Sequence, residues 1–258
     1  VDNKVGWTRP QVLVRWPYGN WPCSYGDTID LPDKSIAYWN RATVLHEYAH
    51  CIMWTAYGNS WPPGGGGAHA IWSEKIGVNG QLIDSNGGFA LIEGWAEFMQ
   101  AAVDNDPNNT ADWSPQGDLD GDGVPGTATL VYNSQTSQWS IQFNDIDDAR
   151  LKNIEDNEWW MGGDYTPDNS GEIVEGAVCS ILWDIFDSPP NDDDNLSLGF
   201  DEIWSIIIND NPNNIKEFWT HWFSTSDNSP INYNYDSQIM ATFNDHGIEP
   251  ALIIVSPT

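Results

Sequence analysis

Two histidines and a glutamate lie close together in the segment TVLHEYAHCI, at positions 46, 50 and 47. Residues four apart on an α-helix point from nearly the same face, so His46 and His50 can bind one metal ion. Glu47 lies about 100° further round the helix, within reach of a water molecule on that ion. A metal lowers the pKa of bound water, and a neighbouring carboxylate can take its proton. The H-E-x-x-H spacing therefore predicts a hydrolytic metal site with Glu47 as general base.

A catalytic zinc site usually has three protein ligands and one open position, so a third ligand is expected nearby. The segment LIEGWAEF supplies Glu93, with Glu97 one helical turn later on the same face. Both acids stand in a hydrophobic segment, where an uncompensated carboxylate is costly. We expect Glu93 to bind the ion and Glu97 to accept the remaining N–H of a ligand histidine. The alternative is a solvated acidic stripe that binds no metal.

The segments HEYAH, EGWAEF and EGAVCSILWDIFD together resemble the gluzincin clan of zinc metallopeptidases, and the fungalysin-like enzymes more than the thermolysins. The resemblance covers roughly residues 39–103 and 170–187. It implies that His46, His50 and Glu93 bind zinc and that Glu47 acts as general base and then general acid. It also implies that Glu97 accepts a hydrogen bond from a ligand histidine and does not contact the zinc ion itself.

One position departs from the fungalysin pattern. There the third helix carries a histidine, thought to stabilise the oxyanion, ten residues before the Leu of L-W-D; here that position is Glu172. A carboxylate cannot donate a hydrogen bond unless it is protonated. Glu172 and Glu175 either line the site in another role or are charges at a helix N-terminus. Other candidate donors are Tyr132, Tyr165, Tyr233, Tyr235 and His221.

Histidine 69 follows a run of four glycines between the two segments that are expected to bind the metal. It could border the cleft for that reason, although a lone histidine is more often a surface or packing residue. The same holds for His246 near the end of the chain.

The run DLDGDGVPG predicts a calcium loop. Asp118, Asp120 and Asp122 take alternate positions, Gly123 follows at the sharp turn, and Val124 is a further possible ligand. Position twelve of the loop is Thr129 rather than glutamate, so the run resembles the shortened calcium loops of dockerin and thrombospondin type 3 repeats. A plain acidic turn is the alternative. Two other acidic clusters, at 144–148 and 191–195, are more simply read as solvated.

Composition restricts the partners. The chain has 38 acidic and nine basic residues, a net charge of −29, which disfavours nucleic acid and anionic membranes because their phosphates would be repelled. It has no run of 18 apolar residues, so membrane insertion is not expected. An extracellular or cell-surface location, as a processed fragment of a longer precursor, is the expected setting. Three cysteines, Cys23, Cys51 and Cys179, allow at most one internal disulfide.

Hydrophobic periodicity gives the elements that must position these residues. Short strands are expected within 11–17 and 27–32, and loop and ribbon within 104–148. Helices are expected over about 39–57, 89–103, 170–187, 200–210, 214–224 and 236–248. The predicted fold is an α+β, zincin-like metallopeptidase domain spanning residues 1–250. A small N-terminal sheet lobe to about residue 80 would carry the HEYAH helix, and a mostly helical C-terminal lobe would face it across the cleft. Residues 251–258 would begin a linker or tail.

These features predict a secreted zinc-dependent endopeptidase that acts on proteins or peptides, with zinc as catalytic and calcium as structural ion. An aminopeptidase is disfavoured because the chain has no G-x-M-E-N-like segment to hold a free amino terminus. One alternative is a zincin-like surface or matrix binding module with little or no activity. Another is a zinc hydrolase acting on glycopeptides, because the chain has 16 tryptophans and indole faces stack on sugars.

Overall fold

The structure is a computed structural model, and it describes residues 11–19, 22–32, 41–106, 113–115, 128–143, 149–151, 171–187, 196–223 and 236–248. Several predictions made from the sequence lie outside these ranges. They are the calcium loop with Asp118, Asp120, Asp122 and Val124, the candidate donors Tyr165, Tyr233 and Tyr235, the acidic clusters at 144–148 and 191–195, and the tail at 251–258.

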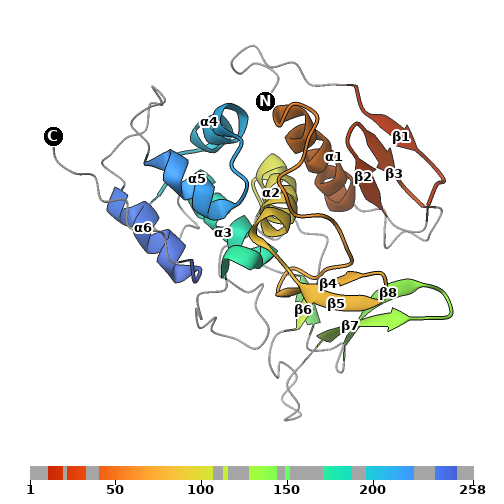
Figure 1. The fold of residues 1–258 in the computed structure, drawn as a ribbon. Coiled ribbons are helices and arrows are strands. Elements are labelled where there is room, and N and C mark those ends of the chain that lie inside the picture. Colours follow the sequence, from red (N-terminus) through yellow and green to blue (C-terminus); the bar gives the residue numbers. More distant parts are fainter. Residues whose placement is uncertain are drawn as a thin grey trace, which may run out of the picture.

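Six α-helices and several small sheets make up the described part of the chain, which is an α+β arrangement (Figure 1). The second helix, α2, packs against both α1 and α3. Helix α4 packs against α1 and α3, α5 against α2 and α4, and α6 against α3. The bounds are α1 Arg41–Ala56, α2 Gly87–Asp104, α3 Glu175–Phe186, α4 Phe200–Asp210, α5 Ile215–Trp222 and α6 Asp236–Asp245.

Helix α2 is well delimited and almost entirely buried. The side chain of Asn86 accepts a hydrogen bond from the Phe89 N–H at its start, and Asn105 ends it in the left-handed conformation. Its residues from Gly88 to Ala101 are all buried. A helix that is buried on all sides has neighbours on all sides, and α2 is therefore central.

Helix α3 starts later than the sequence predicts. Instead of one helix over 170–187, a short 3-10 turn covers Gly171–Ile173, and the α-helix begins at Glu175. Val174 separates them in an extended conformation, with φ −108° and ψ 119°. The β-branched valine favours that conformation over helix. Glu172 and Glu175 therefore do not share one helical face.

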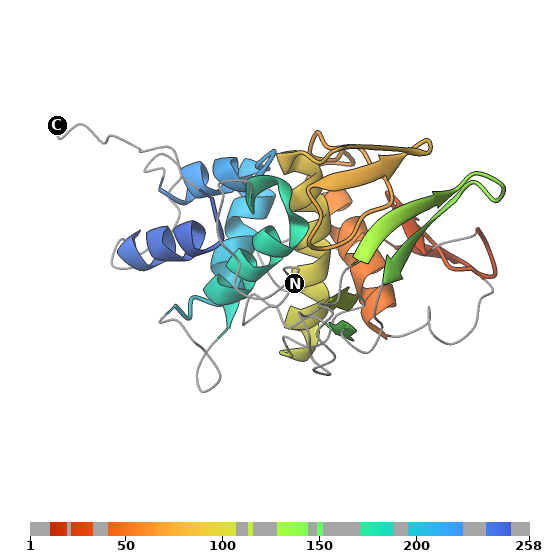
Figure 2. The ribbon, with the colours of Figure 1, turned by 90° about the horizontal axis from the view of Figure 1, so that it is seen from below.

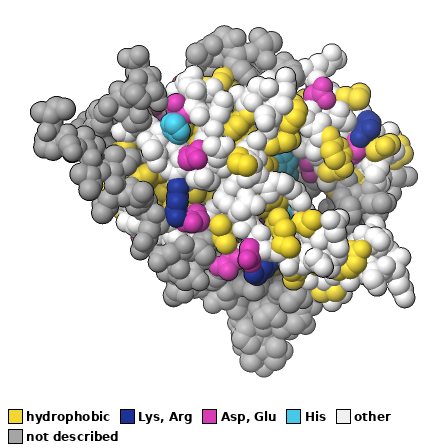
Figure 3. All heavy atoms as spheres, in the orientation of Figure 1, with side chains coloured by type: hydrophobic (Ala, Val, Ile, Leu, Met, Phe, Trp, Pro, Cys, Tyr) yellow, Lys and Arg dark blue, Asp and Glu magenta, His cyan; other side chains and the backbone are white. Residues whose placement is uncertain are grey.

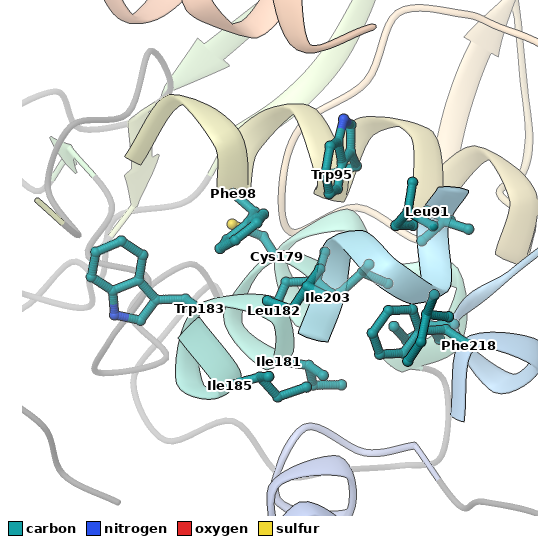
Figure 4. Close-up of a cluster of buried hydrophobic side chains, with 14 of the residues drawn as sticks. Leu91, Trp95, Phe98, Cys179, Ile181, Leu182, Trp183, Ile185, Ile203 and Phe218 are labelled. Atoms are coloured by element: carbon teal, nitrogen blue, oxygen red, sulfur yellow. The ribbon is translucent and has the colours of Figure 1, made fainter. Parts of the chain in front are cut away.

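The main core lies between α2, α3 and α4. In Figure 4, Leu91, Trp95 and Phe98 from α2 face Leu182 of α3 and Ile203 of α4. Trp95 stacks on Trp204 with ring centroids 6.1 Å apart, and both rings are at most 1% exposed. Burying aromatic rings of this size stabilises the arrangement that positions α2.

The strands form a three-stranded sheet and three two-stranded ribbons. Strand β3 (Thr28–Asp30) lies between β1 (Leu13–Arg15), which is parallel to it, and β2 (Cys23–Tyr25), which is antiparallel. This sheet packs against α1. Three antiparallel ribbons follow: β4 (Lys75–Val78) with β5 (Gln81–Asp84), β6 (Trp113–Pro115) with β9 (Ala149–Leu151), and β7 (Ala128–Asn133) with β8 (Gln138–Phe143).

The β4–β5 and β7–β8 ribbons lie side by side (Figures 1 and 2). A Cβ placed on Gly77 would be 2.5 Å from the Trp139 ring, and one on Gly80 would be 2.8 Å from the Tyr132 ring. Only glycine permits such contacts, so the two glycines let the aromatic side chains of one ribbon lie flat on the other.

No helix in the described ranges is long and apolar enough to cross a membrane. In the part of the chain that the structure describes, Cys23, Cys51 and Cys179 form no disulfide bond.

Candidate metal centre

Two neighbouring helices carry the residues that the sequence singled out as a metal site. Helix α1 carries His46, Glu47 and His50, and α2 carries Glu93 and Glu97. The indole N–H of Trp95 donates to the Ala49 carbonyl oxygen at 3.1 Å, so that this pair links the two helices in the middle of the site. Because the bond is buried, it fixes the height of one helix against the other.

Three side-chain atoms of these helices meet in a triangle. The Nε2 atoms of His46 and His50 are 3.1 Å apart, and Glu93 Oε2 lies 3.3 Å from the first and 3.1 Å from the second. Zinc–nitrogen bonds of about 2.0–2.1 Å at tetrahedral angles place two ligand atoms about 3.3 Å apart. The triangle thus has the size that a tetrahedral zinc site requires, and these three residues are a set that could hold an ion.

The chemistry of the triangle also favours a cation. The Nε2 lone pairs of neutral imidazoles and a carboxylate oxygen are all acceptors, so they repel one another unless a proton or a cation lies between them. Without a metal a proton fills that role. Burial disfavours the charged form of His46, but the carboxylates of Glu93 and Glu97 outweigh burial and hold the pKa of His46 well above its ordinary value. Burial raises the pKa of Glu93, and His50 and His69 more than reverse this, to well below the ordinary value.

A buried acid lies behind His46. Glu97 Oε1 lies 3.1 Å from His46 Nδ1, on the side of the ring that faces away from the triangle, and its side chain is 1% exposed. Gln100 donates to the other carboxylate oxygen of Glu97. A carboxylate at Nδ1 keeps a proton on that nitrogen and leaves Nε2 free to bind a metal.

Glu47 is buried beside the triangle without forming one of its corners. Glu47 is 7% exposed to solvent. Burial raises the pKa of its carboxyl group, and the opposing influences come first from His46 and His50 and, at longer range, from His69. A carboxylate with a raised pKa beside a metal site is suited to accept and return a proton at neutral pH.

A third imidazole, that of His69, joins the site from outside the two helices. His69 Nε2 lies 3.6 Å from Glu93 Oε2, and His69 Nδ1 lies 2.7 Å from Glu175 Oε2. Residues 69, 93 and 175 form a second group that could hold an ion, and it shares only Glu93 with the first. From the sequence, His69 was a residue that could border the cleft; in the structure it lies next to Glu93 of the triangle.

Close backbone contacts position His69 next to the triangle. Gly64 and Gly88 lie where the loop after α1 crosses the start of α2, and a Cβ on either would overlap backbone atoms of the other segment. Just before His69, Ala68 pairs with Gly77 of β4, with N–H to oxygen distances of 3.0 and 2.7 Å in the two directions. The imidazole then packs edge-on against the Phe89 ring, 5.3 Å between centroids. The glycine run is therefore what brings the loop close to α2.

Glu175 reaches the site because α2 and α3 approach closely. A Cβ on Gly94 would lie 2.7 Å from the Glu175 carbonyl oxygen and 2.8 Å from Val178 Cβ. The Gly176 N–H donates to the Ile71 carbonyl oxygen at 3.0 Å, so the loop that carries His69 is tied to the first turn of α3. Glu175 itself is 2% exposed.

The other residues considered from the sequence lie elsewhere. Glu172 pairs with Lys216 and lines a pocket of about 300 Å³ with Gly87, Asn214, Glu217 and Thr220. Tyr132 packs on the β4–β5 turn. His221 Nδ1 lies 3.7 Å from Asp210. His246 is buried, with its Nε2 2.8 Å from Asp184 Oδ2. Of the pair Glu172 and Glu175, only Glu175 is placed at the triangle.

The charge balance of the site is negative. Glu47, Glu93, Glu97 and Glu175 are all buried, whereas no lysine or arginine is buried in the part of the chain that the structure describes. Protonated His46 can offset one of these charges. Each further buried carboxylate without a cation costs on the order of several kcal/mol. A divalent metal would supply the missing positive charge.

Two tryptophan rings, those of Trp61 and Trp54, lie next to His50. The Trp61 ring meets the His50 imidazole edge to face at 6.0 Å, and Trp54 lies 5.2 Å from Trp61. Figure 3 shows one histidine side chain at the surface and further histidine atoms recessed near the middle of the face, among hydrophobic, uncharged and acidic side chains.

Comparison of the chain with protein-family models, curated proteins and solved structures finds no match. The candidate site is therefore interpreted from its own geometry.

Proposed function

We propose that this protein is a zinc-dependent endopeptidase of the gluzincin type with a zincin-like fold. One observation carries the proposal: His46, His50 and Glu93 converge in a triangle of 3.1–3.3 Å, with the buried Glu47 beside it and Glu97 behind His46. Two imidazole nitrogens and one carboxylate oxygen, with a further position open, are the ligand set of catalytic zinc sites.

His46, His50 and Glu93 would hold the zinc ion. When bound there, zinc lowers the pKa of water toward about 7 and withdraws electron density from a carbonyl group. Glu97 keeps the His46 ring in the orientation and tautomer that the site needs.

Glu47 moves the proton. Its carboxylate takes a proton from the attacking water as the new C–O bond forms and the carbonyl π electrons move onto the carbonyl oxygen. It then gives this proton to the peptide nitrogen as the C–N bond breaks, so one water is consumed and a carboxylic acid and an amine are released. No covalent bond between the protein and the substrate is needed.

The test is hydrolysis of casein and of a quenched-peptide library by the purified protein, together with its metal content by mass spectrometry. We expect one zinc ion per chain and hydrolysis that a chelator abolishes. Glu47→Gln should retain zinc and lose activity by at least about a hundredfold, because general acid–base catalysis contributes about 10²–10⁴. The matched control is Glu202→Gln on α4, which should leave activity unchanged. Full activity in Glu47→Gln would refute the proposed mechanism.

Glycopeptide hydrolysis is a second candidate, because the Trp54 and Trp61 rings lie next to His50 and indole faces stack on sugars. Faster cleavage of a mucin-type glycopeptide than of the same peptide without sugar would support it. A binding module that retains zinc without turnover is the third candidate, and zinc binding with no hydrolysis of any peptide in the library would favour it.

An extracellular or cell-surface location and a structural calcium ion remain part of the proposal. Both rest on the sequence, namely on the net charge of −29 and the DLDGDGVPG run.

A further inference from the structure

Hydrolysis of a peptide bond puts negative charge on the carbonyl oxygen, and the site should contain a hydrogen-bond donor for it. Two of the donors considered from the sequence, Tyr132 and His221, lie on other parts of the described structure. The first contacts the β4–β5 turn and the second lies near Asp210.

We infer that His69 is this donor and therefore a catalytic residue, and that Glu175 is the residue that positions it. The inference rests on the proposed hydrolysis at the His46–His50–Glu93 triangle. It assigns a role to a loop residue and to an acid at the start of α3, neither of which belongs to the ligand set.

The orientation of the His69 ring supports this role. Its Nδ1 edge is held by Glu175 at 2.7 Å, which leaves the Nε2 edge turned toward Glu93 at 3.6 Å. A ring that donates its Nδ1 hydrogen to a carboxylate and carries a second hydrogen on Nε2 can donate that one to a charged oxygen.

The exposure of His69 differs from that of the ligands. Its side chain is 23% exposed, whereas those of His46, His50 and Glu93 are 12%, 7% and 11% exposed. His69 also shares only Glu93 with the ligand group, so it lies at the rim of the triangle. A group at the rim can meet a substrate that the corners, once occupied by a metal, cannot.

The position of His69 is held from several sides. Glu175 at Nδ1, the Phe89 ring at 5.3 Å and the backbone pairing of Ala68 with Gly77 all limit its movement. A donor fixed before the reaction stabilises developing charge without the cost of reorganisation.

The experiment compares four variants in the full chain: His69→Ala, His69→Gln, Glu175→Gln and the control His221→Gln. The control removes another partly exposed histidine that lies near an acid. Zinc content, zinc affinity, kcat and KM for a quenched peptide, and calorimetric binding of a phosphonate peptide, which mimics the charged oxygen, are measured for each.

We expect His69→Ala to retain zinc with unchanged affinity, to lose about 10²–10³-fold in kcat with little change in KM, and to bind the phosphonate more weakly by a similar factor. His69→Gln should restore part of both losses, because its amide can donate. Glu175→Gln should lower kcat by a smaller factor and leave KM unchanged, and His221→Gln should match the wild type.

The outcomes separate this inference from the proposed function. Unchanged kcat and phosphonate affinity in His69→Ala, in a protein whose activity depends on zinc and Glu47, would overturn the role of His69 alone. Loss of zinc in His69→Ala would show that His69 is a ligand and would overturn it too. A wild-type protein that neither binds zinc nor hydrolyses peptides would refute both, whereas zinc-dependent phosphonate binding tests His69 even if turnover is absent.

Discussion

Replacing Gly94 by alanine tests whether the close contact between α2 and α3 assembles the site. The new Cβ would lie 2.7 Å from the Glu175 carbonyl oxygen, with Val178 Cβ and Cγ1 at 2.8 and 2.9 Å. Favourable contacts between such atoms are at about 3.5–4.0 Å. The two helices would therefore have to separate by roughly 1 Å, and the first turn of α3 would move with Glu175.

The stability change can be worked from opposing effects. Overpacking a core costs about 1–3 kcal/mol, and a clash with backbone on one side and a β-branched side chain on the other should fall in the upper part of that range. Alanine gains about 1 kcal/mol over glycine in a helix interior. The net loss should be about 1–2 kcal/mol, which corresponds to a fall in unfolding temperature of about 2–8 °C for a chain of this size.

Thermal unfolding followed by circular dichroism measures this change. Gly66→Ala is the matched control, because a Cβ at Gly66 meets nothing within 4 Å and the glycine lies in the loop before His69. Zinc content of Gly94→Ala should stay near that of the wild type, since the ligands come from α1 and α2, while kcat should fall because Glu175 no longer holds His69 in place. An unfolding temperature equal to or above that of the wild type would refute the packing argument.

Three further predictions concern the metal. Glu97→Gln should weaken zinc binding by about 10–100-fold, measured against a competing chelator dye; unchanged affinity would remove Glu97 from the site. In the metal-free protein the pKa of His46 is raised by Glu93 and Glu97. The pairing of protonated His46 with these two acids therefore stabilises the folded state fully below about pH 6.5, the pKa of an unperturbed histidine. This stabilisation is lost as the pH rises through the higher pKa of the folded state. Zinc must displace the proton on His46, so calorimetry of zinc binding in two buffers at pH 7 should show release of about one proton. The zinc affinity should rise about tenfold per pH unit up to the folded pKa of His46. Binding without proton release would contradict the raised pKa. Removing zinc should lower stability by about 4 kcal/mol relative to protein in zinc at a thousand times its Kd, and an unfolding temperature insensitive to zinc would argue against binding.

The helices could be predicted from the sequence because their signals are local. Asn86 and the glycines after it begin α2 where the sequence indicated a break, and periodic apolar residues define α1 and α4. The start of α3 was predicted wrongly, since the extended conformation of Val174 interrupts a segment that is otherwise apolar and helical in pattern. Strand β2 was not predicted because the three residues CSY have no recognisable alternation.

The convergence of His46, His50 and Glu93 could be expected from the sequence, because helical geometry fixes which side chains share a face. Four-residue spacing places His46 beside His50 and Glu93 beside Glu97 whatever the rest of the chain does. Only the approach of α1 to α2 was needed to close the triangle, and two hydrophobic helices adjacent in sequence commonly pack together.

His69 and Glu175 could not be assigned in the same way, because no local rule brings them together. Their 2.7 Å contact joins residues 106 apart in the chain. It depends on glycines that let the loop cross α2 and on Gly94, which lets α3 approach. It also depends on where α3 begins, since the extended Val174 directs Glu175 to His69 while Glu172, in the preceding turn, pairs with Lys216. Sequence reasoning could place an acid at the start of this helix, but the side on which it lies is decided by tertiary contacts that only the folded chain contains.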